Sequence, residues 1–231
     1  MEKTKFETKS EFRTYCRGKL NQVCNPFKRD KVISAQLIDQ LCLLKARSIL
    51  LYIPLDIEAD ITQVIRYFRR RYKVYVPFME GISFKMIKYR LPLYKKRFNI
   101  MEPKNSWAVK SKVDVVIVPV LGVDGAFKRI GFGKGMYDRF FESFSSKPTI
   151  LFVQREVCFT QSVVCEEHDI EADIYLTPYK TILKRGTNGF RITSSRSYRS
   201  KRGSRIFHCQ KDGVSQLPNT RRAGACQSKG H

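Results

Sequence analysis

Short apolar runs alternate with amphipathic stretches along most of the chain. Apolar positions at helical spacing predict helices at residues 4–23, 31–46 and 61–71. β-Branched runs that end at proline or turn residues predict strands at residues 48–53, 72–77, 113–118 and 148–153. Residues 81–88 alternate with period two, which predicts a half-exposed strand at a sheet edge. We therefore predict an α/β fold in three layers, with a mostly parallel sheet and helices on both of its faces.

Residues 113–144 carry the strongest pattern for a ligand site. A buried strand is followed by a loop with Gly131, Gly133 and Gly135 at alternate positions, and then by an amphipathic helix. Glycines let backbone N–H groups close around an anion, and a helix N-terminus adds unpaired donors, so the pattern suits a phosphate. A tight turn that needs positive φ would explain the same glycines, and spacing alone leaves both interpretations open.

Composition places limits on the class of protein. The chain has 231 residues, 42% of them hydrophobic, which is enough for one α/β domain with a sizeable core. No apolar run approaches the roughly 18–20 residues that span a bilayer, and the first residues lack the apolar segment of a signal peptide. We therefore expect a cytoplasmic protein without a membrane partner. The seven cysteines are scattered and odd in number, which favours free thiols over a disulfide framework or a zinc site.

The formal net charge of +23 is unevenly placed. Residues 184–231 hold twelve Lys and Arg residues against one acidic residue, Asp212, and are rich in Ser and Gly. Such a composition lacks core-forming residues and predicts a disordered tail. We therefore divide the chain into a domain at residues 1–183 and a basic low-complexity tail at residues 184–231. The tail would suit RNA phosphates, or it is an accidental extension of the reading frame without a role.

Residues 129–138 read R-I-G-F-G-K-G-M-Y-D. This segment resembles the signature R-[LM]-G-x-G-[GK]-G-[YF]-Y-D of the 5-formyltetrahydrofolate cyclo-ligase (5,10-methenyltetrahydrofolate synthetase) family. The departures, Ile130 and Met136, both keep an apolar side chain. The resemblance extends over about residues 9–178. It implies a sheet like that of the sugar-phosphate isomerase and CoA-transferase group, with a site at the carboxyl ends of the strands.

The resemblance also implies an ATP site. Lys9 and Arg13 match the family's N-terminal K-x-x-x-R, which contacts ATP, although their spacing alone would equally suit a solvated basic helix face. Arg129 and Lys134 would act catalytically by balancing charge on the transferred phosphoryl group. The residues expected to contact ATP are Lys9, Arg13, Arg129, Ile130, Gly131, Phe132, Gly133, Lys134, Gly135, Met136 and Tyr137.

For the folate, the resemblance points to Glu58, whose carboxylate would accept hydrogen bonds from the pterin amino and ring N–H groups. Ile53 matches an apolar substrate contact and would equally suit core packing. Trp107 is typical of either a pocket wall or a core or lid residue, and Tyr137 would face either the ligand or the core. Residues 99–103 resemble a segment that lines the substrate cleft.

For Mg²⁺, the resemblance implies Asp138 and Asp173 as two oxygen ligands, the others coming from phosphate and water. Asp173 matches the second aspartate of the family's closing h-D-x-x-x-D-x-[IV]-[IL]-T. The alternative is that Asp173 only begins an edge strand.

The resemblance implies ATP-dependent cyclisation of 5-formyltetrahydrofolate, including polyglutamylated forms, to 5,10-methenyltetrahydrofolate through a phosphorylated formyl group. We expect a monomer. Two alternatives are a basic RNA-binding protein that acts through its tail and a non-catalytic relative that binds nucleotide.

Overall fold

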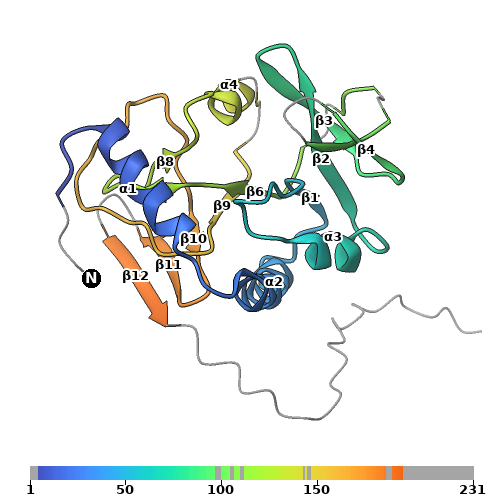
Figure 1. The fold of residues 1–231 in the computed structure, drawn as a ribbon. Helices are drawn as coiled ribbons and strands as arrows, with labels where there is room; N and C mark the ends of the chain where they lie inside the picture. The colour runs from blue at the N-terminus through green and yellow to red at the C-terminus, as the bar shows by residue number, and fades with distance from the viewer. Residues whose placement is uncertain are drawn as a thin grey trace, which may run out of the picture. The chain divides into compact units, whose positions relative to one another are not determined.

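The computed structural model describes residues 5–96, 100–104, 107–109, 112–142, 144, 147–185 and 189–194 (Figure 1). An eight-stranded sheet has the order β12-β11-β10-β9-β6-β1-β2-β3. Its parallel strands are β1 (Ser48–Leu50), β2 (Lys73–Glu80), β6 (Val115–Pro119), β9 (Thr149–Val153) and β10 (Ile174–Leu176). Antiparallel strands flank them: β3 (Ser83–Lys88) at one edge, and β11 (Lys180–Arg185) with β12 (Gly189–Ser194) at the other. The predicted mostly parallel sheet is confirmed, and so is the edge position of β3.

Alternate side chains of the central strands point to opposite faces, and helices cover both faces. Ile117 and Leu151 are paired in register and pack with residues of α2 (Pro26–Leu43) and α3 (Thr62–Phe68). Val118 and Phe152 point the other way and pack with Phe140 of α4 (Met136–Glu142). In Figure 1, α2 and α3 lie below the sheet and α4 above it. Burial on both faces explains why these strands read as continuous apolar runs.

The first helix, α1 (Lys9–Asn21), forms a third cluster near two short strands, β7 (Gly122–Val123) and β8 (Arg129–Ile130). Thr8 caps the helix, because its side chain accepts a hydrogen bond from the Glu11 backbone N–H. Phe12, Cys16 and Leu20 form the buried stripe of α1, and Ile130 packs in the same cluster. This contact brings the first helix to the glycine loop that follows β8.

The remaining short strands, β4 (Leu93–Lys95) and β5 (Met101–Pro103), pair with each other. No helix within the described ranges is long and apolar enough to cross a membrane. Among the five described cysteines, no disulfide is formed. Cys209 and Cys226 lie outside the described residues.

The sheet continues past the domain boundary that composition placed at residue 183. In β11 and β12, Ile182 pairs with Ile192 and Leu183 pairs with Arg191, and the hairpin ends at Ser194. Arg191 and Ile192 are exposed, so an edge hairpin accommodates the basic residues that seemed to open a tail. The basic residues therefore become frequent along the sequence before the last strand of the sheet ends. The remainder of the predicted tail, residues 195–231, lies outside the described residues.

Candidate functional site

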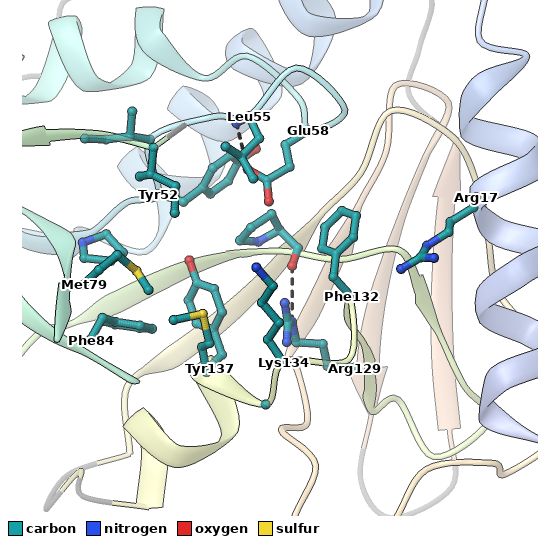
Figure 2. A pocket seen from close by; sticks show the side chains of 16 residues that line it. Arg17, Tyr52, Leu55, Glu58, Met79, Phe84, Arg129, Phe132, Lys134 and Tyr137 are labelled. Carbon is teal, nitrogen blue, oxygen red and sulfur yellow. Dashed lines mark hydrogen bonds between the residues drawn. The ribbon is translucent and has the colours of Figure 1, made fainter. Parts of the chain in front are cut away.

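A pocket of about 350 Å³ opens at the carboxyl ends of β1 and β6. The loop after β1 contributes Ile53 and Glu58, and Pro119 ends β6. Figure 2 shows Tyr137, Met79 and Phe84 on one side of the pocket and Phe132 on the other, with Lys134 extending between Tyr137 and Phe132. The pocket therefore combines apolar and aromatic walls with one carboxylate and cationic side chains, which suits a flat, polar-edged ring system.

A second, polar pocket of about 270 Å³ lies on the other side of the glycine loop. Its wall contains the backbone of Gly131, Gly133 and Gly135, where Gly133 and Gly135 have φ of 92° and 59°. Such φ angles are strained for residues with a Cβ, so glycine is required at both positions. Charged side chains complete the wall: Lys9, Arg13, Arg129, Asp138, Arg139, Glu142 and Asp169.

Arg129 lines both pockets and is buried, with 7% of its surface exposed. Its Nε donates to the Pro119 carbonyl oxygen at 3.2 Å, and its guanidinium carbon lies 4.8 Å from the Tyr137 ring centroid. Asp138 Oδ2 is 4.0 Å from Nη1. Burial lowers the pKa of Arg129, and the charge of Asp138 opposes this effect. An arginine stays protonated in proteins, so the site holds a fixed positive charge between its two pockets.

Gly131 makes the position of Arg129 possible. A Cβ at Gly131 would lie 2.7 Å from Cζ of Arg129, well inside van der Waals contact. The first glycine of the loop is therefore required by the close approach of the guanidinium, whereas the other two are required by their backbone angles.

Helix α1 reaches the polar pocket through two residues that the sequence predicted for ATP. The Nζ of Lys9 donates to both carboxylate oxygens of Asp169 at 2.5 Å, and Nε of Arg13 donates to the Gly131 carbonyl oxygen at 2.9 Å. Arg17 continues the same helix face, lines the larger pocket and lies 5.9 Å from the Phe132 ring centroid. The sequence reasoning missed Arg17, although the spacing of four from Lys9 to Arg13 to Arg17 was available as a signal.

Glu58 is partly buried in the loop between β1 and α3, where its Oε2 accepts a hydrogen bond from Leu55 N at 3.0 Å. Burial raises the pKa of Glu58 to about 7, while Arg129 and Arg155 act in the opposite direction. Burial also raises the pKa of the Tyr137 hydroxyl above its ordinary value. The pocket therefore holds a carboxyl group that changes charge near neutral pH beside a tyrosine that remains protonated.

The structure brings together most of the folate and ATP residues predicted from the sequence. Ile53, Glu58 and Tyr137 line the larger pocket, as do Phe132, Lys134 and Met136 from the glycine loop. Ile100, from the predicted cleft segment, also lines it. The side chain of Ile130 is fully buried with Phe12 and Leu121, so it supports the loop from below.

Two predicted residues lie elsewhere. Trp107 is 94% exposed and does not line the pocket. Asp173 directly precedes β10, at the amino end of a parallel strand, and its Oδ2 accepts a hydrogen bond from Ile150 N at 2.8 Å. Asp173 therefore lies at the amino ends of the parallel strands, whereas the larger pocket opens at their carboxyl ends, and Asp173 is not paired with Asp138. The carboxylate that does share the polar pocket with Asp138 is Asp169, four residues earlier.

The carboxylates of the polar pocket are the candidate ligands for Mg²⁺. Within the described ranges, no group of three or more His, Cys, Asp or Glu residues is arranged to hold a metal ion. Mg²⁺ beside a nucleotide commonly needs only one or two carboxylates, because phosphates and waters supply the other ligands. Asp138 fits that requirement: its Oδ1 accepts a hydrogen bond from Ile170 N at 3.3 Å, and its Oδ2 is 4.0 Å from Arg129 Nη1. Both oxygens of Asp169 accept closer hydrogen bonds from Lys9.

Comparison with known proteins gives this geometry a context. The sequence profile of the 5-formyltetrahydrofolate cyclo-ligase family matches residues 5–178. The chain belongs to this family. The 5-formyltetrahydrofolate cyclo-ligase of Mycolicibacterium smegmatis is 31% identical over 94 residues, which are 39% of this chain and 48% of that protein. The matched region thus spans about half the length of this curated cyclo-ligase.

Solved structures support the cyclo-ligase fold. The 5,10-methenyltetrahydrofolate synthetase of Aquifex aeolicus superposes with a TM-score of 0.65 at 24% identity, covering 84% of this chain and 98% of that one. The enzyme from Mycoplasma pneumoniae superposes with a TM-score of 0.60 at 16% identity, covering 74% and 99%. At these identities the structures show a shared fold, and the predicted α/β architecture is confirmed.

Proposed function

We propose that this chain converts 5-formyltetrahydrofolate and ATP into 5,10-methenyltetrahydrofolate, ADP and phosphate. One observation carries the proposal: Arg129 lines both an aromatic pocket with a carboxylate and a polar pocket that the glycine loop, three further cations and three carboxylates line. A cation at the junction of two such pockets suits a phosphoryl transfer between a ring-bearing acceptor and a nucleotide.

The larger pocket would take the pterin. Its walls of Phe84, Tyr137 and Met79 provide apolar contact for the ring faces. Glu58 in its ionised form would accept hydrogen bonds from the ring amino and N–H groups, and this orients the formyl group towards Arg129.

The polar pocket would take the triphosphate. Backbone groups of the glycine loop and the side chains of Lys9 and Arg13 face it. Asp138 would hold Mg²⁺, which when bound neutralises phosphate charge. Arg129 and Lys134 would balance the charge that develops on the γ-phosphoryl group as it leaves ADP.

The reaction has two steps that use this arrangement. The formyl oxygen attacks the γ-phosphorus, the bond to ADP breaks, and the formyl group becomes an imino-phosphate. N10 then adds to the activated carbon and gives up its proton, and the C–O bond breaks as phosphate leaves with the former formyl oxygen and that proton. Phosphorylation turns a poor leaving group into a good one, so the protein's contribution is positioning and charge neutralisation.

The test is direct. Purified protein with Mg-ATP and 5-formyltetrahydrofolate should develop the absorbance of the methenyl product and release ADP in equal amount, and omission of ATP should abolish both. ATP binding without product would instead identify a non-catalytic relative. Absence of both product and ATP binding would overturn the proposal as a whole.

A further inference from the structure

Arg155 lies just beyond the carboxyl end of β9 and lines neither pocket, yet three of its nitrogens are engaged. Nε and Nη2 donate to the two carboxylate oxygens of Asp30 at 2.8 and 2.9 Å, which is a bidentate pair. Nη1 donates to the backbone carbonyl oxygen of Asp56 at 2.6 Å. The guanidinium therefore ties the start of α2 to the loop between β1 and α3.

The Arg155–Asp30 pair is largely shielded from water. The side chains are 13% and 9% exposed, and Asp30 lies on the buried face of α2 with Ile33 and Leu37. A charge removed from water in this way requires close, well-directed partners, and the bidentate geometry provides them. Because α2 packs on the central sheet through this face, Asp30 gives Arg155 a fixed support.

The loop that Arg155 holds carries Glu58. Within it, Glu58 N donates to the Leu55 carbonyl oxygen at 2.9 Å, and Leu55 N donates to Glu58 Oε2 at 3.0 Å. Asp56 is inside this closed turn, so its carbonyl is the point at which Arg155 holds the turn from outside. Further along, Tyr52 Oη donates to the Ala59 carbonyl oxygen at 2.8 Å. The turn is therefore fixed at two points, and Glu58 lies between them.

We propose that Arg155, supported by Asp30, is a positioning residue that holds the Glu58 carboxylate in the orientation needed to bind the substrate ring. This inference rests on the proposed function for its ligand. Arg155 does not touch the pocket, and it acts through the Asp56 carbonyl and through its charge. Arg129 and Arg155 favour the charged form of Glu58, the hydroxyls of Tyr52 and Tyr137 also interact with it, and Lys134 lines the same pocket.

Three variants separate geometry from charge. Arg155→Met removes both. Arg155→Lys keeps the charge but loses the bidentate pairing with Asp30, and Asp30→Asn weakens the support of the guanidinium. We expect Arg155→Met to raise the KM for 5-formyltetrahydrofolate about tenfold while the KM for ATP changes less than about twofold. Its pH profile for folate kcat/KM should shift to higher pH, because Glu58 loses a favourable cation. Arg155→Lys should raise the folate KM with little shift of the profile, and Asp30→Asn should have a smaller effect of the same kind.

Arg29→Met is the matched control. Arg29 precedes Asp30 in α2; its Nη1 donates to the Arg155 backbone carbonyl oxygen at 3.2 Å and pairs with Glu156. Arg29 therefore holds the same segment after β9, and none of its interactions among the described residues reaches the Glu58 turn. Equal changes in Arg155→Met and Arg29→Met would overturn the inference, because general damage to the α2 contact would explain both.

Amide hydrogen exchange gives a readout that needs no activity. In the protein without ligands, residues 55–59 should exchange faster in Arg155→Met than in the wild type or Arg29→Met. Unchanged exchange there would overturn the positioning role even if the wild type is an active cyclo-ligase. Faster exchange in Arg155→Met, combined with a wild-type protein that forms no methenyl product, would instead keep the positioning of the turn and reject the proposed function.

Discussion

The guanidinium of Arg129 lies 4.8 Å from the ring centroid of Tyr137, and both residues line the pocket proposed for the folate. The Pro119 carbonyl and Asp138 hold the same guanidinium from two other directions. Its orientation is therefore set before any ligand binds. A charge that needs no reorganisation stabilises developing negative charge more effectively than a mobile one.

Arg129 and Lys134 should differ in what their removal does to stability. Both Arg129→Ala and Lys134→Ala should lower kcat by on the order of a hundredfold or more, because each removes a cation from the transferring phosphoryl group. Arg129 is buried, and its loss should also lower the free energy of unfolding by about 1–3 kcal/mol. Lys134 is exposed, so the melting temperature of Lys134→Ala should stay near that of the wild type. Turnover near the wild-type value in either variant would remove that residue from the proposed mechanism.

Gly131→Ala should impair catalysis by displacing Arg129, since the added Cβ would lie within 2.7 Å of the guanidinium carbon. We expect a loss of kcat on the order of tenfold or more, with ATP binding changed less. Gly18→Ala is the control: Gly18 lies in α1 with nothing within 4 Å of an added Cβ. That change should keep full activity and raise the free energy of unfolding by about 0.5–1 kcal/mol. A fully active Gly131→Ala enzyme would contradict the close approach of Arg129.

The raised pKa of Glu58, about 7, predicts opposite pH effects on binding and stability. Because the pKa of Glu58 in the folded protein lies above its ordinary value of 4.5, the protonated group favours folding at low pH. The free energy of unfolding should therefore fall by up to about 3 kcal/mol as pH rises from 4.5 through about 7. Glu58→Gln lacks this loss and should be more stable than the wild type at pH 8, with a smaller difference at pH 5. Its folate KM should rise at pH 8, because the wild-type carboxylate binds the ring when ionised. Denaturant unfolding at both pH values measures the first effect, and an unchanged folate KM would reject the ring contact.

Asp169→Asn and Asp173→Asn form a pair that tests which aspartate serves the nucleotide. Asp169→Asn disturbs Lys9 in the polar pocket and should raise the KM for ATP several-fold. Asp173→Asn retains an oxygen that can accept from Ile150 N, so ATP kinetics and the Mg²⁺ requirement should remain near normal. A strongly increased Mg²⁺ requirement in Asp173→Asn would restore the assignment made from the sequence motif.

Two truncations test where the functional domain ends. A chain that ends at Ser194 keeps every described strand and should retain wild-type kcat and melting temperature. A chain that ends at Leu183 loses β12 and the ion pair of Lys184 with Glu171. Its melting temperature should fall by roughly 5 °C or more. Loss of activity in the chain that ends at Ser194 would show that residues 195–231 contribute to the enzyme.

The features predicted well from the sequence are those that a contiguous segment determines. β6 is apolar on both faces because both faces are covered, and the glycine loop is required by its own backbone angles. Asp169 and Asp173 show the limit of this approach. They are four residues apart in one motif. Between them, however, the chain passes from the polar pocket, which Asp169 lines, to the amino ends of the parallel strands, where Asp173 lies. Which aspartate lines the polar pocket depends on where β10 begins, and the motif does not contain that information.

Residues whose role depends on a partner far away in the sequence could not be predicted from the local pattern. Arg155 and Asp30 are 125 positions apart, and nothing in the local pattern of either segment indicates their partner. The β11–β12 hairpin was missed for a related reason. Its basic composition resembles a tail, and only its pairing with the sheet edge shows that it belongs to the domain.

The ion pair between Lys9 and Asp169 joins positions 160 residues apart, and Arg13 reaches the glycine loop over 118 residues. A growing polypeptide would therefore expose α1 long before its partners emerge from the ribosome, leaving the stripe of Phe12, Cys16 and Leu20 without its cover. Nascent chains that end before Asp169 should fail to bind nucleotide. Assembly of the catalytic centre would then be among the last events of biosynthesis, which makes the early helix a point of vulnerability to misfolding.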